Sequence, residues 1–188
     1  MSNKGNYGSI VQNDLGRSFE IYLDRDLTEP EDFRAELQAI RSCGPADKVT
    51  IYMNCHGGRL DTMMSFVNSI RNTRAEVMCV AEGTIASAAT MIAMVCDSVV
   101  IMPHTRFMIH NVSYGACGFG NNVQAQAEFY TKENQRLLED LYQGFLSVEE
   151  IAKVVGGQEL WLSDDEALER FKKRATLLAE KQEEDSQD

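Results

Sequence analysis

Apolar residues fall into two kinds of pattern along the chain, one typical of strands and the other of helices. Short apolar or alternating runs predict strands, at residues 19–23, 49–53, 98–102 and 107–110. Apolar residues three and four positions apart predict helices, at residues 28–43, 60–70 and 123–146, after Ser147 and after Ser163. Strands and helices therefore alternate, which indicates an α/β domain.

The stretch from Val77 to Val95 (VMCVAEGTIASAATMIAMV) contains a short apolar run, a glycine and an Ala-rich segment of helical length. We expect a strand that breaks at Gly83 and a helix after the turn. Ser87 then lies near the N-terminus of that helix, where free backbone N–H groups stabilise a developing oxyanion. A nucleophile fits this place, and so does a small residue that merely allows close packing.

Residues 54–58 (Asn-Cys-His-Gly-Gly) directly follow one predicted strand and precede a predicted helix. The backbone N–H groups of such a loop are well placed to hold an anion or a carbonyl oxygen. Glycines at this place also serve ordinary turns. The loop is therefore a candidate binding element only in combination with other signals.

Three histidines are candidates for a general base. His104 lies in a polar turn and is expected in solvent. His56 lies in the Gly-Gly loop, and His110 ends an apolar strand just before a Gly-rich segment. Either could face a cleft and accept a proton, whereas a structural role is the simpler explanation for any single histidine.

The length of 188 residues favours one substantial domain. We place a mobile segment at 1–16, the domain at 17–176, and a charged tail expected to be disordered at 177–188. The net charge of −11 argues against nucleic acid as a partner. No apolar stretch is long enough to predict a membrane span.

Five scattered cysteines without a CxxC pair predict reduced thiols and no metal site. The first residues, MSNKGNYGS, lack the apolar core of a signal peptide. These features favour a cytoplasmic location or a similarly reducing organelle compartment. No phosphate-binding loop of the nucleotide-hydrolase type is present in the sequence.

Four segments in order carry a resemblance to a known family, namely YMNCHGG at 52–58, EGTIASAAT at 82–90, MPHTRFMIHN at 102–111 and GQELWLSDDEAL at 157–168. Together they resemble the ClpP family of self-compartmentalised serine peptidases, from about Arg17 to Ala167. The resemblance implies a ClpP/crotonase-like α/β fold with a protruding strand–helix handle. In that handle, a Gly-rich strand at 114–122 would pair with substrate backbone, and the next long helix would join two rings.

The resemblance assigns roles to individual residues. Ser87 is expected to be the nucleophile and His110 the general base. Glu159 takes the place of the aspartate that orients the base in the family, and its simpler explanation is a surface carboxylate. The backbone N–H groups of Gly58 and Ala88 are expected to form the oxyanion hole.

The resemblance also implies partners. We expect self-assembly into a heptameric ring, alone or stacked as a tetradecamer, and unfolded polypeptide as the substrate. An AAA+ Clp ATPase would feed it, with Tyr52 in the docking cleft, or another ClpP-type subunit would join the ring. No cofactor is expected, because only the partner ATPase would use ATP.

Several positions depart from the family pattern. Gly157 and Gln158 replace an acidic–basic pair that helps to lock two rings together, and Asn72 replaces an aromatic residue of the docking cleft. A non-catalytic ring subunit, acting as scaffold or regulator, is therefore an alternative. An acyl-CoA enzyme of the related crotonase fold is a second alternative, although such sites usually carry carboxylates rather than a Ser–His pair.

Overall fold

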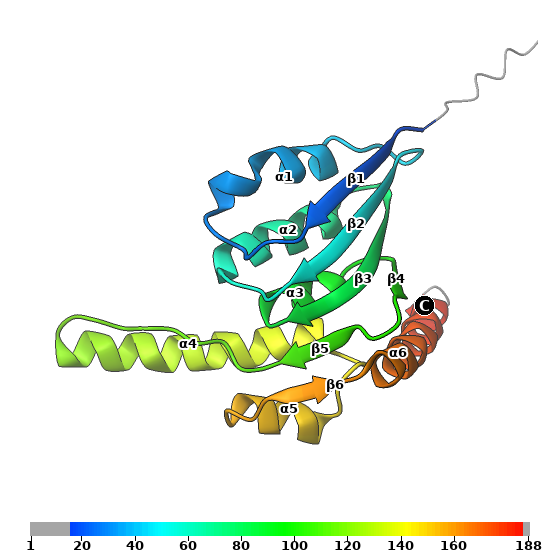
Figure 1. Ribbon diagram of the computed structural model, residues 1–188. Coiled ribbons are helices and arrows are strands. Elements are labelled where there is room, and N and C mark those ends of the chain that lie inside the picture. The colour runs from blue at the N-terminus through cyan, green and yellow to red at the C-terminus, as the bar shows by residue number, and fades with distance from the viewer. Residues whose placement is uncertain (1–15, 186–188) are drawn as a thin grey trace, which may run out of the picture.

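A single mixed sheet organises the chain in the computed structural model, which describes residues 16–185 (Figure 1). Its main path runs β1-β2-β3-β5-β6, and β4 pairs with β3 beside that path. The strands are β1 (Ser18–Leu23), β2 (Lys48–Cys55), β3 (Glu76–Ala86), β4 (Ser98–Ile101), β5 (Arg106–Ile109) and β6 (Leu160–Leu162). All pairs are parallel except that of β5 with β6. This arrangement confirms the expected α/β class.

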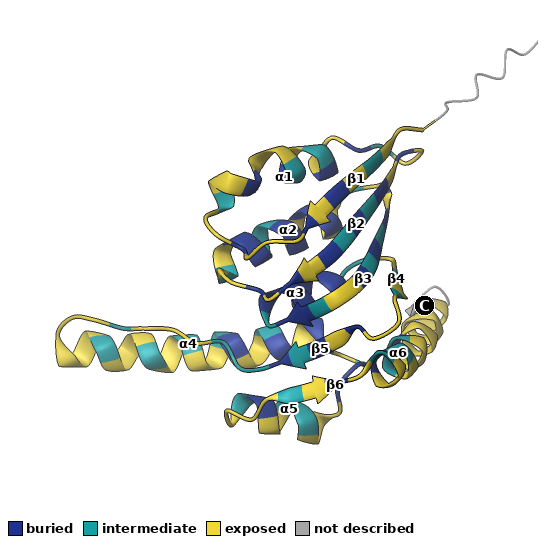
Figure 2. Cartoon of the chain, in the orientation of Figure 1, coloured by how far each residue is buried: buried dark blue, intermediate teal, exposed yellow. Residues whose placement is uncertain are grey.

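Helices pack on one face of the parallel part of the sheet and around its β5–β6 end (Figure 1). They are α1 (Arg34–Arg41, after a 3-10 turn at Pro30–Phe33), α2 (Leu60–Asn72), α3 (Ala88–Ala93), α4 (Gly120–Leu141), α5 (Val148–Val155) and α6 (Asp164–Asp185). Burial alternates along β1 and β2, with Ile21, Leu23 and Ile51 buried toward the helices. Figure 2 shows the resulting buried layer between the sheet and α2 and α3.

Strand β3 is the central element of the sheet. On one side it pairs with β2, and on the other side its first half pairs with β4 and its last residues pair with β5. The strand does not end at Gly83, as the sequence pattern predicted, but continues to Ala86. Gly83 has φ +82° and lies against the Asn54 side chain, whose Oδ1 accepts a hydrogen bond from the Thr84 N–H at 3.0 Å. The glycine therefore allows a local distortion within the strand.

Three other expectations need correction. The long helix α4 begins at Gly120 and ends at Leu141, rather than spanning 123–146. Strand β6 was not expected from the sequence pattern. Helix α6 continues to Asp185, through most of the segment that was expected to be disordered. The predicted mobile segment at 1–16 lies, except for its last residue, outside the described residues.

Helix α4 projects away from the sheet, and the segment that leads into it from β5 runs alongside (Figure 1). This matches the predicted handle in outline. The segment from 110 to 119 is extended without forming a strand in the structure, so the expected Gly-rich strand has no pairing partner within the described chain. The side chains at the base of α4 are buried, at Asn134, Leu138 and Leu141, whereas most of the distal half is exposed.

Candidate active site

Ser87 occupies a strained turn between β3 and α3. Its φ of 54° and ψ of −127° are rare for a residue with a side chain and cost about 1–3 kcal/mol. The Ser87 N–H donates to the Met108 carbonyl of β5 at 2.8 Å, and the Ser87 carbonyl accepts from the Thr90 N–H at 3.0 Å. The main chain on both sides of the serine is thus fixed by neighbours, and the hydroxyl is not consumed in capping α3.

The Gly-Gly loop packs directly against this turn. Gly57 has φ +95°, and a Cβ added there would lie 2.8 Å from Ser87 Cβ and 2.9 Å from the Ala88 nitrogen. Only glycine fits so close an approach. The loop is held in place from its other side, because Leu27 N–H donates to the Gly57 carbonyl at 2.8 Å and Arg59 N–H donates to the Leu27 carbonyl at 2.7 Å.

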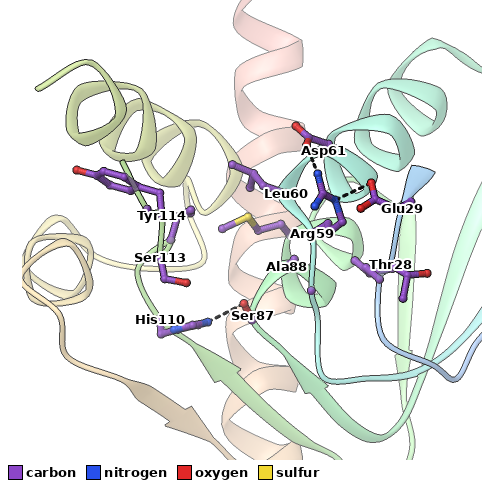
Figure 3. Close-up of a pocket in the computed structure, with 15 residues that line it drawn as sticks. Thr28, Glu29, Arg59, Leu60, Asp61, Ser87, Ala88, His110, Ser113 and Tyr114 are labelled. Carbon is purple, nitrogen blue, oxygen red and sulfur yellow. Dashed lines mark hydrogen bonds and ion pairs between the residues drawn. The ribbon is translucent and has the colours of Figure 1, made fainter. Parts of the chain in front are cut away.

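His110 follows the last residue of β5 and points at Ser87 (Figure 3). Its Nε2 lies 2.6 Å from Ser87 Oγ, within hydrogen-bond distance. Strand β5 pairs in parallel register with the end of β3, Ala86 opposite Met108, so the sheet itself brings the two side chains together. A serine hydroxyl bonded to an imidazole is the arrangement that general-base activation of a nucleophile requires.

A groove of about 890 Å³ opens over the Ser87–His110 pair. One wall is formed by Leu27–Glu29 and Gly58–Asp61, and the opposite wall by Val112–Gly115 (Figure 3). The buried Met91 and the half-buried Leu60 make part of the lining apolar.

The amides of Gly58 and Ala88 both belong to residues that line this groove. Within residues 16–185, neither N–H donates to an acceptor in the structure. The parallel bridge between Leu27 and Gly58 uses the groups of Gly57 and Arg59 instead, so the Gly58 N–H stays free. Two unpaired main-chain N–H donors beside a serine hydroxyl are the groups that an oxyanion hole requires.

Glu159 lies opposite His110 when the strand register is continued by one residue. Strands β5 and β6 are antiparallel, with Ile109 opposite Leu160, and His110 and Glu159 are the next pair. Directly opposed side chains of antiparallel strands lie about 4.5–5.5 Å apart at Cβ. The Glu159 carboxylate nevertheless accepts a hydrogen bond from the Trp161 indole at 3.0 Å, and none joins it to His110 among the described residues.

Charged residues gather at one end of the groove, a feature that the sequence pattern did not single out. The Arg59 guanidinium contacts the Glu29 carboxylate at 3.1 Å and the Asp61 carboxylate at 3.0 Å (Figure 3). All three side chains are about half exposed or more. The trio therefore adds little to stability and presents a net negative charge at the end of the groove.

The other two histidines do not line the groove. His104 is in the turn between β4 and β5, and its main-chain N–H donates to the Asp164 carboxylate at 2.6 Å. His56 is exposed in the Gly-Gly loop. No cluster of three candidate metal ligands occurs between residues 16 and 185, and no helix there is long and apolar enough to cross a membrane.

Two buried hydroxyls behind Ser87 were also missed by the sequence pattern. Thr90 of α3 and Tyr142, which caps the C-terminus of α4, are fully buried, and their hydroxyl oxygens lie 2.5 Å apart. Burial raises the pKa of the Tyr142 hydroxyl, so this group stays protonated at any ordinary pH. Because the two residues are 52 positions apart, no local motif could have indicated their contact.

The sequence of this chain is similar to those of Clp protease subunits. The sequence model of the Clp protease family matches residues 3–170. An ATP-dependent Clp protease proteolytic subunit 3 from Rhizobium etli is 28% identical over 80% of this chain and 78% of its own length. The protein of that name from Rhizobium meliloti is 25% identical over 85% of this chain and 84% of its own length. A proteolytic subunit 1 from Corynebacterium glutamicum is 28% identical over 64% of this chain and 62% of its own length.

Proposed function

This chain belongs to the Clp protease (ClpP) family, and we propose that it is a serine endopeptidase subunit of a ring-shaped compartmentalised protease that cleaves unfolded polypeptides. The mixed α/β fold agrees with the ClpP/crotonase fold of the family. The observation that carries the proposal is the 2.6 Å contact between Ser87 Oγ and His110 Nε2 at the floor of an open groove.

The first half of the reaction follows from this contact. Ser87 Oγ attacks the carbonyl carbon of a peptide bond while His110 Nε2 takes the hydroxyl proton. The carbonyl oxygen becomes an oxyanion, which the N–H groups of Gly58 and Ala88 stabilise. Each such donor contributes about 3–4 kcal/mol to the transition state.

The second half returns the enzyme to its starting state. The protonated His110 gives its proton to the leaving amine, the C–N bond breaks, and an acyl group remains on Ser87. Water then attacks the acyl group, with His110 taking one of its protons. His110 returns that proton to Ser87 Oγ as the ester C–O bond breaks. The product is a carboxylic acid, which loses its remaining proton to solvent. No metal or organic cofactor takes part.

Glu159 is proposed as the residue that orients His110. Support comes from the β5–β6 register, which would set Glu159 opposite the histidine if it continued one residue beyond the Ile109–Leu160 pair. A different rotamer of Glu159 would then release the Trp161 indole and allow a hydrogen bond to the His110 imidazole. A carboxylate bonded to the imidazole would hold the tautomer in which Nε2 accepts the serine proton.

The outer face of the sheet is proposed as the place where an AAA+ Clp ATPase docks. Tyr22, Tyr52, Val80 and Val100 stand opposite one another across four parallel strands. The two tyrosine rings stack at 5.1 Å, and Tyr22 and Val100 are exposed. An apolar row exposed on a sheet face is typical of an interaction site. We also propose that the chain assembles into rings, with copies of itself or with another ClpP-type subunit. Its proposed location is the cytoplasm or a similarly reducing compartment.

Cleavage of a short peptide by the purified protein tests the enzymatic proposal without the ATPase. A suitable probe is an N-acetyl tripeptide aminocoumarin amide with leucine before the scissile bond, because part of the groove lining is apolar. We expect the wild type to release aminocoumarin and the Ser87→Ala variant to release none above background. Equal rates for the two assembled proteins would exclude Ser87 as the nucleophile.

One observation favours a second candidate, a non-catalytic ring subunit that acts as scaffold or regulator. The Glu159 carboxylate accepts from Trp161 rather than from His110, and no carboxylate of residues 16–185 orients the histidine. An acyl-CoA enzyme of the crotonase fold has no comparable support, because the groups beside the free amides are a serine and a histidine. A scaffold would assemble normally and show no activity that depends on Ser87.

A further inference from the structure

The peptide group between Ser87 and Ala88 connects the nucleophile with one of the proposed oxyanion donors. In a planar trans peptide, the C=O and the following N–H point in opposite directions. Whatever fixes the direction of the Ser87 carbonyl therefore fixes the direction of the Ala88 N–H. The residues bound to that carbonyl decide whether the donor points into the groove.

A chain of two hydroxyls holds this carbonyl. Thr90 Oγ1 lies 2.6 Å from the Ser87 oxygen and 2.5 Å from the Tyr142 hydroxyl. A carbonyl oxygen only accepts, so the single Thr90 hydroxyl proton is donated to Ser87. Tyr142 must then donate to Thr90. Each bond in such a chain polarises the next, and neither hydroxyl reaches water, since both side chains are fully buried.

Tyr142 is anchored independently of the active-site turn. It caps the C-terminal end of α4, and its carbonyl accepts from the N–H groups of Phe145 and Leu146 at 2.9 and 3.0 Å. The Tyr142 hydroxyl therefore reaches the turn from a different part of the chain. The Thr90 N–H also donates to the Ser87 carbonyl at 3.0 Å, but that bond lies within the turn that begins the six-residue helix α3 and does not tie the carbonyl to another part of the chain.

We infer that Thr90 and Tyr142 are positioning residues, which hold the Ser87–Ala88 peptide so that the Ala88 N–H faces the developing oxyanion. The inference rests on the proposed peptidase function. It also makes the base of the α4 handle part of the support of the active site. The two residues touch no substrate and act only through the main chain of Ser87.

The test compares four variants with the wild type, using the tripeptide aminocoumarin amide. Thr90→Val and Tyr142→Phe each remove a hydroxyl with almost no change of shape, and Thr90→Ser keeps the hydroxyl. Thr105→Val is the matched control, because Thr105 is also buried and also donates to a main-chain carbonyl, at 2.7 Å to Met102, away from the groove. Thermal unfolding and size-exclusion chromatography establish that each protein is folded and assembled.

Removal of an oxyanion donor lowers kcat by about 100–1000-fold, and a misdirected donor should cost part of that. We therefore expect Thr90→Val and Tyr142→Phe to lower kcat about tenfold with KM nearly unchanged. Thr90→Ser should restore kcat to within about threefold of wild type. Thr105→Val should match Thr90→Val in its loss of thermal stability and keep the wild-type kcat. A purely structural role of Thr90 or Tyr142 would lower the melting temperature and leave kcat of the folded protein unchanged.

The double variant Thr90→Val/Tyr142→Phe gives the sharpest readout. Tyr142 acts through Thr90, so the double variant should be no slower than Thr90→Val alone, which is the non-additivity expected of groups in one network. Multiplying effects, or a kcat for Tyr142→Phe equal to that of wild type, would overturn the inference. A wild type that shows no Ser87-dependent cleavage would instead refute the proposed function, so the two failures are distinguishable.

Discussion

Ser87 Oγ and His110 Nε2 lie 2.6 Å apart because the end of β3 pairs with β5. Both residues were predicted to be catalytic from the resemblance of short motifs to the ClpP family. The strand register that joins them could be inferred in outline, since adjacent strand ends in a parallel sheet meet at one edge. The rotamer of Glu159 and the hydrogen-bonded hydroxyls of Thr90 and Tyr142 behind Ser87 could not be inferred from the sequence. Both depend on which side chains meet in three dimensions, and sequence spacing carries no such information for residues on separate elements.

At the residue scale, Glu159→Gln tests the proposed orienting role. Glutamine keeps the length of the side chain but loses the charge, and it no longer favours the tautomer that leaves Nε2 free to accept a proton. We expect kcat for the peptide amide to fall at least tenfold. The control is Trp161→Phe, which removes the competing indole donor and should leave kcat equal to or above that of wild type. Full activity of Glu159→Gln would show that His110 works without this carboxylate.

At the element scale, propensity and capping located most helices but set some boundaries wrongly. Helix α5 follows Ser147 as expected, and Ser147 and Glu150 form a capping box at its start, with both reciprocal hydrogen bonds present. Gly83 was expected to end a strand, yet the pairing of β3 with β5 carries the strand past it. Tertiary pairing overrides a local break when the glycine can adopt a positive φ. Helix α6 likewise extends through a charged segment that composition alone suggested to be disordered.

The ion pair between α5 and α6 gives an element-scale prediction. Arg170 contacts both carboxylate oxygens of Glu150, at 2.7 and 2.9 Å, and this pairing lowers the pKa of Glu150 to about 2. The stabilisation is full above the unfolded pKa, near 4.5, and is lost as the pH falls toward 2. Arg170→Met should therefore lower the melting temperature at pH 7 by about 2–4 °C, corresponding to about 1 kcal/mol.

The difference in melting temperature between wild type and Arg170→Met should shrink between pH 4.5 and pH 2, as differential scanning calorimetry would record. Arg136→Met serves as control, because Arg136 contacts Glu133 at 3.5 Å on an exposed surface. That variant should change the melting temperature by less than about 1 °C at any pH. A pH-independent effect of Arg170→Met would mean that packing of the arginine stem or its hydrogen bond to the Phe145 carbonyl, rather than its pairing with Glu150, stabilises this part of the fold.

At the scale of the whole molecule, the protruding handle exposes large apolar side chains that nothing in the isolated chain covers within the described residues. Phe119 is 81% exposed and Phe129 is 60% exposed, both on the handle. We propose that these two exposed aromatic side chains contact another copy of the chain. The family resemblance implies that this contact joins two rings, although Gly157 and Gln158 replace the pair that normally helps to lock them.

Phe129→Asp tests the role of the handle in assembly. If two rings stack through it, a charge at this position should leave single rings, so the mass found by analytical ultracentrifugation should be half that of wild type. Gln124→Asp places the same charge on an exposed position of α4 that faces away from Phe129 and should keep the wild-type mass. An unchanged double ring in Phe129→Asp would exclude this part of the handle from the contact. A single ring in the wild type would show that the rings do not stack.

Activation of Ser87 as a nucleophile can be read from the intact mass of the protein after reaction with a fluorophosphonate. The reagent phosphonylates a serine only where a base and an oxyanion hole activate it. We predict one adduct for each wild-type chain, and none on Ser87→Ala. An assembled, folded wild type that takes up no adduct would contradict the activation of Ser87 and favour the non-catalytic ring subunit.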